Sequence, residues 1–164
     1  VYLMQQKFDE EGNSIKLINS SVSGDTTGGG LGRLAKNLKK FKPDFVLIEL
    51  GGNDALRGYS IKLIKSNLEK MIALIKQNKS KVLLMQIRIP PNYGQKYMLA
   101  FEKIYKDLAL SEEVYLMPFM LEEIGINSDL MQPDGIHPNK KAQSLIAKDV
   151  KKNIDKFLLI NQSN

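Results

Sequence analysis

Apolar residues gather along this chain in short runs that are separated by amphipathic segments. Four runs rich in branched side chains are strand candidates, and they span Ile15 to Val22, Phe45 to Leu50, Val82 to Ile87 and Val114 to Phe119. Between and after them apolar residues recur at spacings of three and four, the period of one helix face. This spacing predicts helices near 31 to 40, 64 to 75, 95 to 109 and 142 to 158. Residues 1 to 8 read as the middle of a further helix.

Strand and helix alternate four times, which is typical of right-handed crossovers between parallel strands. The strand candidates are nearly continuous apolar runs, as expected for a sheet covered on both faces. The pattern therefore predicts an α/β fold with a parallel sheet. We find no repeat, no linker and no apolar stretch long enough to span a membrane. We expect one domain over 1–160, a frayed tail at 161–164 and no stable membrane insertion.

The composition of the chain restricts its chemistry. Its 164 residues include no Cys and a single His, so thiol nucleophiles, disulfides, cysteine zinc sites and a poly-His metal centre are excluded within one chain. Only carboxylates would remain as metal ligands, and these favour hard ions. The composition therefore leaves a carboxylate-based metal site open.

The net charge of +6 invites a nucleic-acid interpretation. However, only three of the 24 basic residues are Arg, and no aromatic residues interleave with the lysines as a base-stacking surface would need. The lysines instead decorate amphipathic segments as solvated helix faces. We therefore expect no nucleic-acid partner, while an anionic small molecule is compatible with the charge.

Ligands of open parallel sheets bind beyond the carboxyl ends of the strands, so the loops there are the candidate sites. In the last of these loops Asp134 and His137 stand three residues apart, in a turn closed by Pro133 and Pro138. A carboxylate beside an imidazole is half of a hydrolytic triad, because it orients the ring that takes a proton from a nucleophile. The alternative is that Asp134 or Asn139 caps the last helix and that His137 is an incidental turn residue.

Two earlier loops contain candidate donors for an oxyanion. Asn53 follows two glycines at a strand end, where an uncharged amide could stabilise a developing negative charge. The backbone N–H of Gly24 could be a second donor. Both residues have a purely structural alternative as turn formers. Asp54 could cap the following segment or orient Asn53, and we assign it no proton-transfer role.

Three blocks carry a family resemblance in their order and spacing. Residues 19–26 (NSSVSGDT), 49–54 (ELGGND) and 134–139 (DGIHPN) resemble the SGNH hydrolases, also called GDSL esterases. The resemblance is closest to the bacterial subgroup of acyl-CoA thioesterase I, lysophospholipase and arylesterase, and it extends through 85–90 and 92–94. It covers essentially the whole chain.

The resemblance implies a three-layer α/β/α, flavodoxin-like fold and a Ser-His-Asp hydrolase that acts on acyl esters or thioesters without a metal or a cofactor. His137 would be the general base and acid, Asp134 its orienting partner, and Gly24 and Asn53 the oxyanion donors. Five residues lie in loops that could shape an acyl groove, with packing as the alternative: Leu56, Arg57, Ile89, Pro91 and Tyr93. The resemblance also suggests a periplasmic or secreted enzyme, although a cytoplasmic location stays open, and a monomer is favoured.

The family's Gly-Asp-Ser nucleophile motif does not occur in these residues. Thr26 in Gly24-Asp25-Thr26 is a near match, but that segment already aligns with the second block, so we reject Thr26 as the nucleophile. We expect an N-terminally truncated domain whose first strand and serine precede Val1, and whose 164 residues alone are inactive. In the flavodoxin-like strand order 2-1-3-4-5 the missing strand is interior, so its loss would separate Ile15 to Val22 from the sheet.

Two other functions are compatible with parts of the sequence. Residues 30–35 fit the G-x-G-x-x-A pattern of nucleotide-binding proteins, but that pattern should follow its strand directly, and here several residues intervene. The second is a non-catalytic lipid-binding or scaffold protein that truly lacks the serine.

Overall fold

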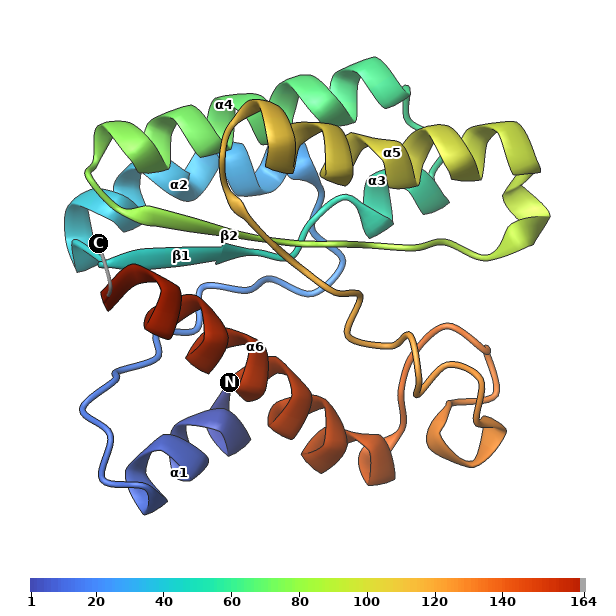
Figure 1. The fold of residues 1–164 in the computed structure, drawn as a ribbon. Helices are drawn as coiled ribbons and strands as arrows, with labels where there is room; N and C mark the ends of the chain where they lie inside the picture. Colours follow the sequence, from blue (N-terminus) through green and yellow to red (C-terminus); the bar gives the residue numbers. More distant parts are fainter. Residues whose placement is uncertain (163–164) are drawn as a thin grey trace. The chain divides into compact units, whose positions relative to one another are not determined.

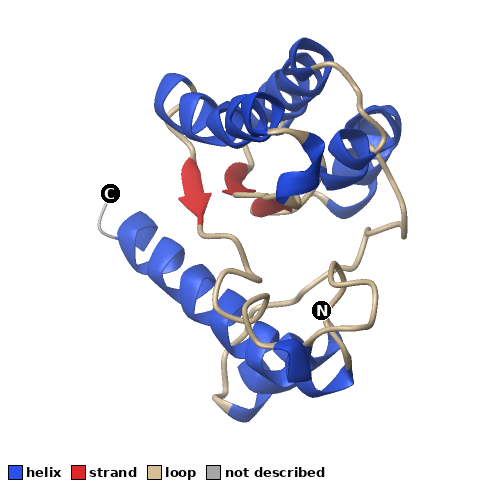
Figure 2. Ribbon diagram, turned by 90° about the vertical axis from the view of Figure 1, so that its right-hand side faces the viewer, coloured by secondary structure: helices blue, strands red, loops and turns tan. Residues whose placement is uncertain are grey.

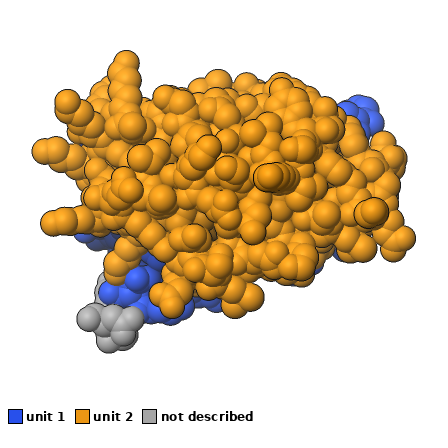
Figure 3. Space-filling view, turned by 90° about the horizontal axis from the view of Figure 1, so that it is seen from above, with its two compact units in different colours: residues 1–20, 120–164 blue, residues 21–119 orange. Residues whose placement is uncertain are grey.

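A computed structural model describes residues 1–162 of the chain. It divides into two compact units, which Figure 3 colours separately. Unit 1 comprises Val1–Ser20 and Met120–Asn164, and unit 2 comprises Ser21–Phe119. Each unit is described by itself.

Unit 2 contains a parallel sheet of three strands in the order β1-β2-β3. These are β1 (Phe45–Ile48), β2 (Lys81–Met85) and β3 (Tyr115–Met117), and in their register Val46 lies opposite Val82 and Leu84 opposite Leu116. Three of the four predicted strands are thus confirmed, in the order that the flavodoxin-like arrangement gives its last three strands. The predicted α/β class is confirmed as well.

Three long helices, α2 (Thr27–Phe41), α4 (Ile61–Gln77) and α5 (Gln95–Ser111), cover one face of this sheet (Figures 1 and 2). Their apolar stripes form the core with the strands, and the fully buried side chains include Ile64, Leu68, Ile72, Phe101 and Leu108. The pattern missed the short helix α3 (Gly52–Leu56), because five residues are too few for a helical period to be visible. Residues 30–35 lie inside α2, so the nucleotide-binding pattern lacks its strand-to-helix turn.

In unit 1, helix α1 (Tyr2–Glu10) packs on helix α6 (Gln143–Gln162). Phe8 of α1 is fully buried, and the Lys151 ammonium lies 4.7 Å from the centre of its ring. Lys151 also binds Glu11 at 2.5 Å and Asp155 at 2.9 Å. Helix α6 includes residues 161 and 162 of the tail expected to be frayed, and 163–164 lie outside the described residues.

Ile15 to Val22, predicted as a strand, is not one in the structure. A strand needs a neighbour to satisfy its backbone groups, and none of the three described strands pairs with this segment. Instead the side-chain amide of Gln5 donates to the Ile15 carbonyl oxygen at 2.9 Å and accepts from the Leu17 N–H at 2.7 Å. The apolar run alone could not reveal that these residues pair with a side chain.

Candidate active site

The loop that contains Asp134 and His137 is closed by hydrogen bonds across its base. Met131 and Pro138 form an antiparallel bridge, and the Gln132 N–H donates to the His137 carbonyl oxygen at 2.8 Å. The Gln132 side chain donates to the Pro138 carbonyl oxygen at 3.1 Å. The loop is therefore held in shape by bonds among its own residues.

Within this loop Asp134 and His137 form a pair, with Oδ2 of the carboxylate 2.7 Å from Nδ1 of the ring. The other carboxylate oxygen accepts from the backbone N–H groups of Ile136, at 2.9 Å, and His137, at 3.0 Å. The bonds from the His137 backbone and ring, and then from Ile136, lower the pKa of Asp134 to about 2. Because an ionised carboxylate only accepts, Nδ1 is the donor, and the proton-exchanging nitrogen is Nε2. The ring is exposed, and among the described residues Nε2 has no hydrogen-bond partner.

Asn139 anchors the loop to the helices on both sides. Its amide donates to the carbonyl oxygens of Asp129, at 2.8 Å, and Met131, at 3.1 Å, and its oxygen accepts from the Lys141 N–H at 2.9 Å. Asn139 therefore caps the short 3₁₀ helix η3 (Lys140–Ala142), which directly precedes α6, whereas the bonds of Asp134 are to its own loop.

The candidate oxyanion donors are the Gly24 N–H and the Asn53 side-chain amide. Within residues 1–162 neither the Gly24 N–H nor the Asn53 side-chain amide is engaged in a hydrogen bond. Gly24 is exposed and has φ +73°, a conformation that glycine adopts without strain. Asn53 lies partly exposed in the first turn of α3, directly beyond the carboxyl end of β1.

The entry into α3 is fixed by Gly51 and Tyr105. Gly51 has φ +115°, and a Cβ atom there would lie 2.2 Å from the Tyr105 hydroxyl oxygen. This hydroxyl donates to the Leu50 carbonyl oxygen at 2.9 Å. Burial, followed by the charges of Asp54 and Glu49, raises the pKa of Tyr105 well above its ordinary value, so the phenol stays a donor.

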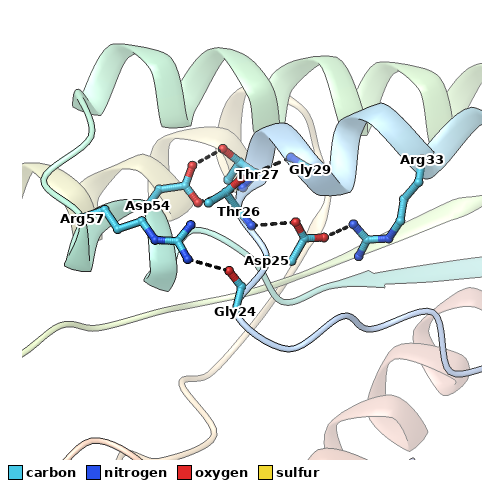
Figure 4. Close-up of polar contacts among 8 residues, drawn as sticks. All are labelled: Gly24, Asp25, Thr26, Thr27, Gly29, Arg33, Asp54 and Arg57. Carbon is cyan, nitrogen blue, oxygen red and sulfur yellow. Dashed lines mark hydrogen bonds and ion pairs between the residues drawn. The ribbon is translucent and has the colours of Figure 1, made fainter.

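Two residues that follow Asn53, Asp54 and Arg57, join its loop to that of Gly24 (Figure 4). The buried Asp54 accepts from the N–H of Thr27, at 2.8 Å, and from its hydroxyl, at 2.5 Å. Arg57 donates to the Gly24 carbonyl oxygen at 3.0 Å. Asp54 thus contacts the first turn of α2, rather than capping a later segment as one of our interpretations expected.

Two residues of this network were not identified from the sequence. Thr27 is the first residue of α2, and nothing in the sequence distinguishes it from other residues at the start of a helix. Asn67 donates from α4 to the Thr27 hydroxyl oxygen at 3.0 Å, and it lies among Ile64, Leu68 and Met71 on the buried face of the helix. An Asn in an apolar stripe was therefore the available signal.

Thr26, rejected above as a nucleophile, is the N-cap of α2. Its hydroxyl accepts from the Gly29 N–H at 3.2 Å, and its own N–H donates to Asp25 at 2.9 Å. Asp25 in turn forms an ion pair with Arg33 (Figure 4). The hydroxyl thus has a capping role, which accounts for a Thr at this position.

The proposed groove residues lie in different surroundings. Leu56 is half-buried, while Pro91 and Tyr93 are exposed on the short 3₁₀ helix η1 (Pro91–Tyr93). Ile89 is 6% exposed and belongs to the core. Because β1 and β2 are parallel, the loops with these residues leave the same edge of the sheet.

Unit 1 contains the Asp134–His137 pair, and unit 2 contains the oxyanion and groove candidates. Over residues 1–162 there is no group of three or more His, Asp or Glu side chains placed to hold a metal ion. Over the same residues no helix is long and apolar enough to cross a membrane.

The chain matches known proteins along most of its length. The model of the GDSL-like Lipase/Acylhydrolase family matches residues 2–145. An arylesterase of Vibrio mimicus is 50% identical over 149 residues, which are 91% of this chain and 74% of that protein. The "Thioesterase 1/protease 1/lysophospholipase L1" of Escherichia coli K12 is 45% identical over 139 residues, 85% of this chain and 67% of that protein.

A solved structure shows the same likeness. The psychrotrophic esterase EstA from Pseudoalteromonas sp., in a structure inhibited by monoethylphosphonate, is 43% identical with a TM-score of 0.93. The match covers 95% of this chain and 85% of that chain. It confirms the α/β fold that the resemblance implied.

Proposed function

Because the chain belongs to the GDSL-like lipase/acylhydrolase family, we propose that it acts in the hydrolysis of acyl esters or thioesters by a serine mechanism. The observation that carries this proposal is the Asp134–His137 pair, with its 2.7 Å contact and its carboxylate held ionised. The names of the similar proteins, an arylesterase and a thioesterase and lysophospholipase, suggest aryl esters, acyl-CoA thioesters or lysophospholipids as substrates.

In the proposed mechanism a serine hydroxyl attacks the acyl carbonyl carbon while His137 Nε2 takes its proton. Asp134 stabilises the imidazolium that forms. The Gly24 N–H and the Asn53 amide donate to the oxyanion of the tetrahedral intermediate. The imidazolium then gives its proton to the leaving alcohol or thiol, and water repeats the sequence on the acyl-enzyme.

We place the serine in a Gly-Asp-Ser segment that precedes Val1, and we infer that residues 1–160 belong to one domain with it. The absence of this motif from the 164 residues supports the inference, and so does Nε2 of His137, which has no hydrogen-bond partner within residues 1–162. Export to the periplasm or medium remains a prediction from the family resemblance, which cell fractionation would test.

The second candidate is a non-catalytic lipid-binding or scaffold protein, and the missing serine is the observation that favours it. An assay of p-nitrophenyl butyrate hydrolysis separates the two. The chain extended upstream through Gly-Asp-Ser should hydrolyse the ester, and the 164 residues alone should not. Equal activity of both forms would refute the placement of the serine. An upstream sequence without Gly-Asp-Ser, together with an inactive protein, would favour the non-catalytic candidate.

The oxyanion assignment has its own test. Asn53→Ala in the extended enzyme should lower kcat by about 100 to 1,000-fold, the usual cost of one lost oxyanion donor. Unchanged kcat would remove Asn53 from the mechanism.

A further inference from the structure

Two residues that follow Asn53 in the sequence contact the segment around Gly24. Asp54 follows it directly and binds Thr27, and Arg57 comes four residues after it and binds Gly24. Figure 4 shows Asp54 of α3 reaching Thr27 at the start of α2, and Arg57, just after α3, reaching Gly24 in the segment that leads into α2. The helix that carries one oxyanion donor is thus held at two points to the segment that carries the other.

The inner contact is buried and complete in its hydrogen bonds. Asp54 is 1% exposed and Thr27 is fully buried, and among the described residues the carboxylate has no cationic partner. A buried carboxylate needs compensation, and it finds this at the first residue of the 15-residue helix α2, where the helix dipole favours negative charge. The Thr27 hydroxyl accepts from Asn67 and donates to Asp54, so its direction is fixed. Such a fully satisfied buried network specifies one arrangement.

The outer contact is exposed and holds the next peptide of the same turn. Arg57 donates to the carbonyl oxygen of Gly24, and the N–H of the same peptide, from Asp25, donates to the Val22 carbonyl oxygen at 3.2 Å. The peptide group between Gly24 and Asp25 is therefore hydrogen-bonded through both its C=O and its N–H. Because this peptide group is held, the backbone rotation of Gly24 is limited.

We propose that the Asp54–Thr27 and Arg57–Gly24 contacts are positioning contacts that set the spacing between the Gly24 N–H and the Asn53 amide. The inference rests on the proposed function, because it concerns the oxyanion site of that reaction. Oxyanion donors are effective only when they are oriented before the charge develops. Loosening the buried contact should therefore lower kcat about 10 to 100-fold, as small displacements of reacting groups do.

The test uses the chain with its upstream segment, assayed on p-nitrophenyl butyrate and titrated with phenylboronic acid, which forms a tetrahedral adduct with an active-site serine. Thr27→Val removes the hydroxyl and keeps the N–H, whereas Thr27→Ser keeps both. We expect Thr27→Val to lower kcat and boronic acid affinity in parallel by about 10 to 100-fold, with KM within about threefold. Thr27→Ser should stay within about threefold of the parent. Ile72→Val, in the core of α4, controls for lost stability and should leave kcat unchanged.

Parallel loss in Thr27→Val with retention in Thr27→Ser supports the proposal. Unchanged boronic acid affinity in Thr27→Val, or equal losses in both variants, would overturn it. If Thr27→Val does not fold, the exposed Arg57→Ala takes its place, with an expected loss of about 2 to 10-fold in both measures. No loss in either measure would then overturn the proposal. An inactive parent enzyme would instead refute the proposed function.

Discussion

Gly51 offers a direct test of how the end of β1 is built. Gly51→Ala places a Cβ atom 2.2 Å from the Tyr105 hydroxyl oxygen, at a backbone φ of +115°. The left-handed conformation costs a non-glycine residue about 1–3 kcal/mol, and forcing a buried side chain aside costs about another 1–3 kcal/mol. We therefore expect the free energy of unfolding to fall by about 2–6 kcal/mol in urea titrations.

A double-mutant cycle separates these two costs. Tyr105→Phe removes the hydroxyl and its bond to Leu50, at a cost of about 1 kcal/mol. In the double variant Gly51→Ala/Tyr105→Phe the new Cβ meets the ring carbon at 3.5 Å, which is an ordinary contact. The combined cost should therefore be about 1–3 kcal/mol less than the sum of the single costs.

Gly58→Ala is the matched control, because Gly58 has φ +71° and open space around its Cβ position. It should show the conformational cost alone, about 1–2 kcal/mol. Additive costs of Gly51→Ala and Tyr105→Phe, or equal costs of Gly51→Ala and Gly58→Ala, would refute the role of the Tyr105 hydroxyl.

Three further predictions concern a helix end and the Asp134–His137 loop. Glu113, just after α5, has φ +50°, and its negative charge lies at the C-terminus of that helix. Both features are unfavourable for Glu, so Glu113→Gly should raise the free energy of unfolding, measured by urea titration, by about 0.5–1 kcal/mol. The folded pKa of Asp134, about 2, lies below its ordinary value of 3.8, so the stability that its bonds contribute is present above pH 4 and is lost as the pH falls through about 2. A pH titration of the Asp134 carboxyl ¹³C chemical shift measures this pKa, and a midpoint near 4 would contradict the prediction. Asp134→Asn should lower kcat on the order of 10,000-fold in the extended enzyme, because the imidazolium loses its partner, and activity within tenfold of the parent would speak against the pair.

The periodic parts of the fold were predictable from the sequence, because buried strands and helix faces leave regular apolar patterns. The helices α2, α4, α5 and α6 and the strands β1 to β3 all lie where these patterns indicate. Ile15 to Val22 shows the limit of this approach. Its branched apolar residues are typical of a strand, but whether a strand forms depends on a neighbour in space.

The candidate site was predictable where a short spacing fixes the geometry. Asp134 and His137 are three residues apart, so one turn brings them together. The contacts of Asp54 with Thr27 and of Arg57 with Gly24 join residues 27 and 33 positions apart. Such contacts are set by the packing of α2, α3 and α4, and no local spacing encodes them.

The rate of ester hydrolysis by His137→Ala in the upstream-extended protein tests the central claim most directly. The ring is 66% exposed, so its removal should leave the fold and the thermal unfolding midpoint nearly unchanged. The account predicts that kcat for p-nitrophenyl butyrate falls by at least about 1,000-fold while the circular dichroism spectrum is retained. A folded His137→Ala variant that hydrolyses the ester at the parent rate would contradict it.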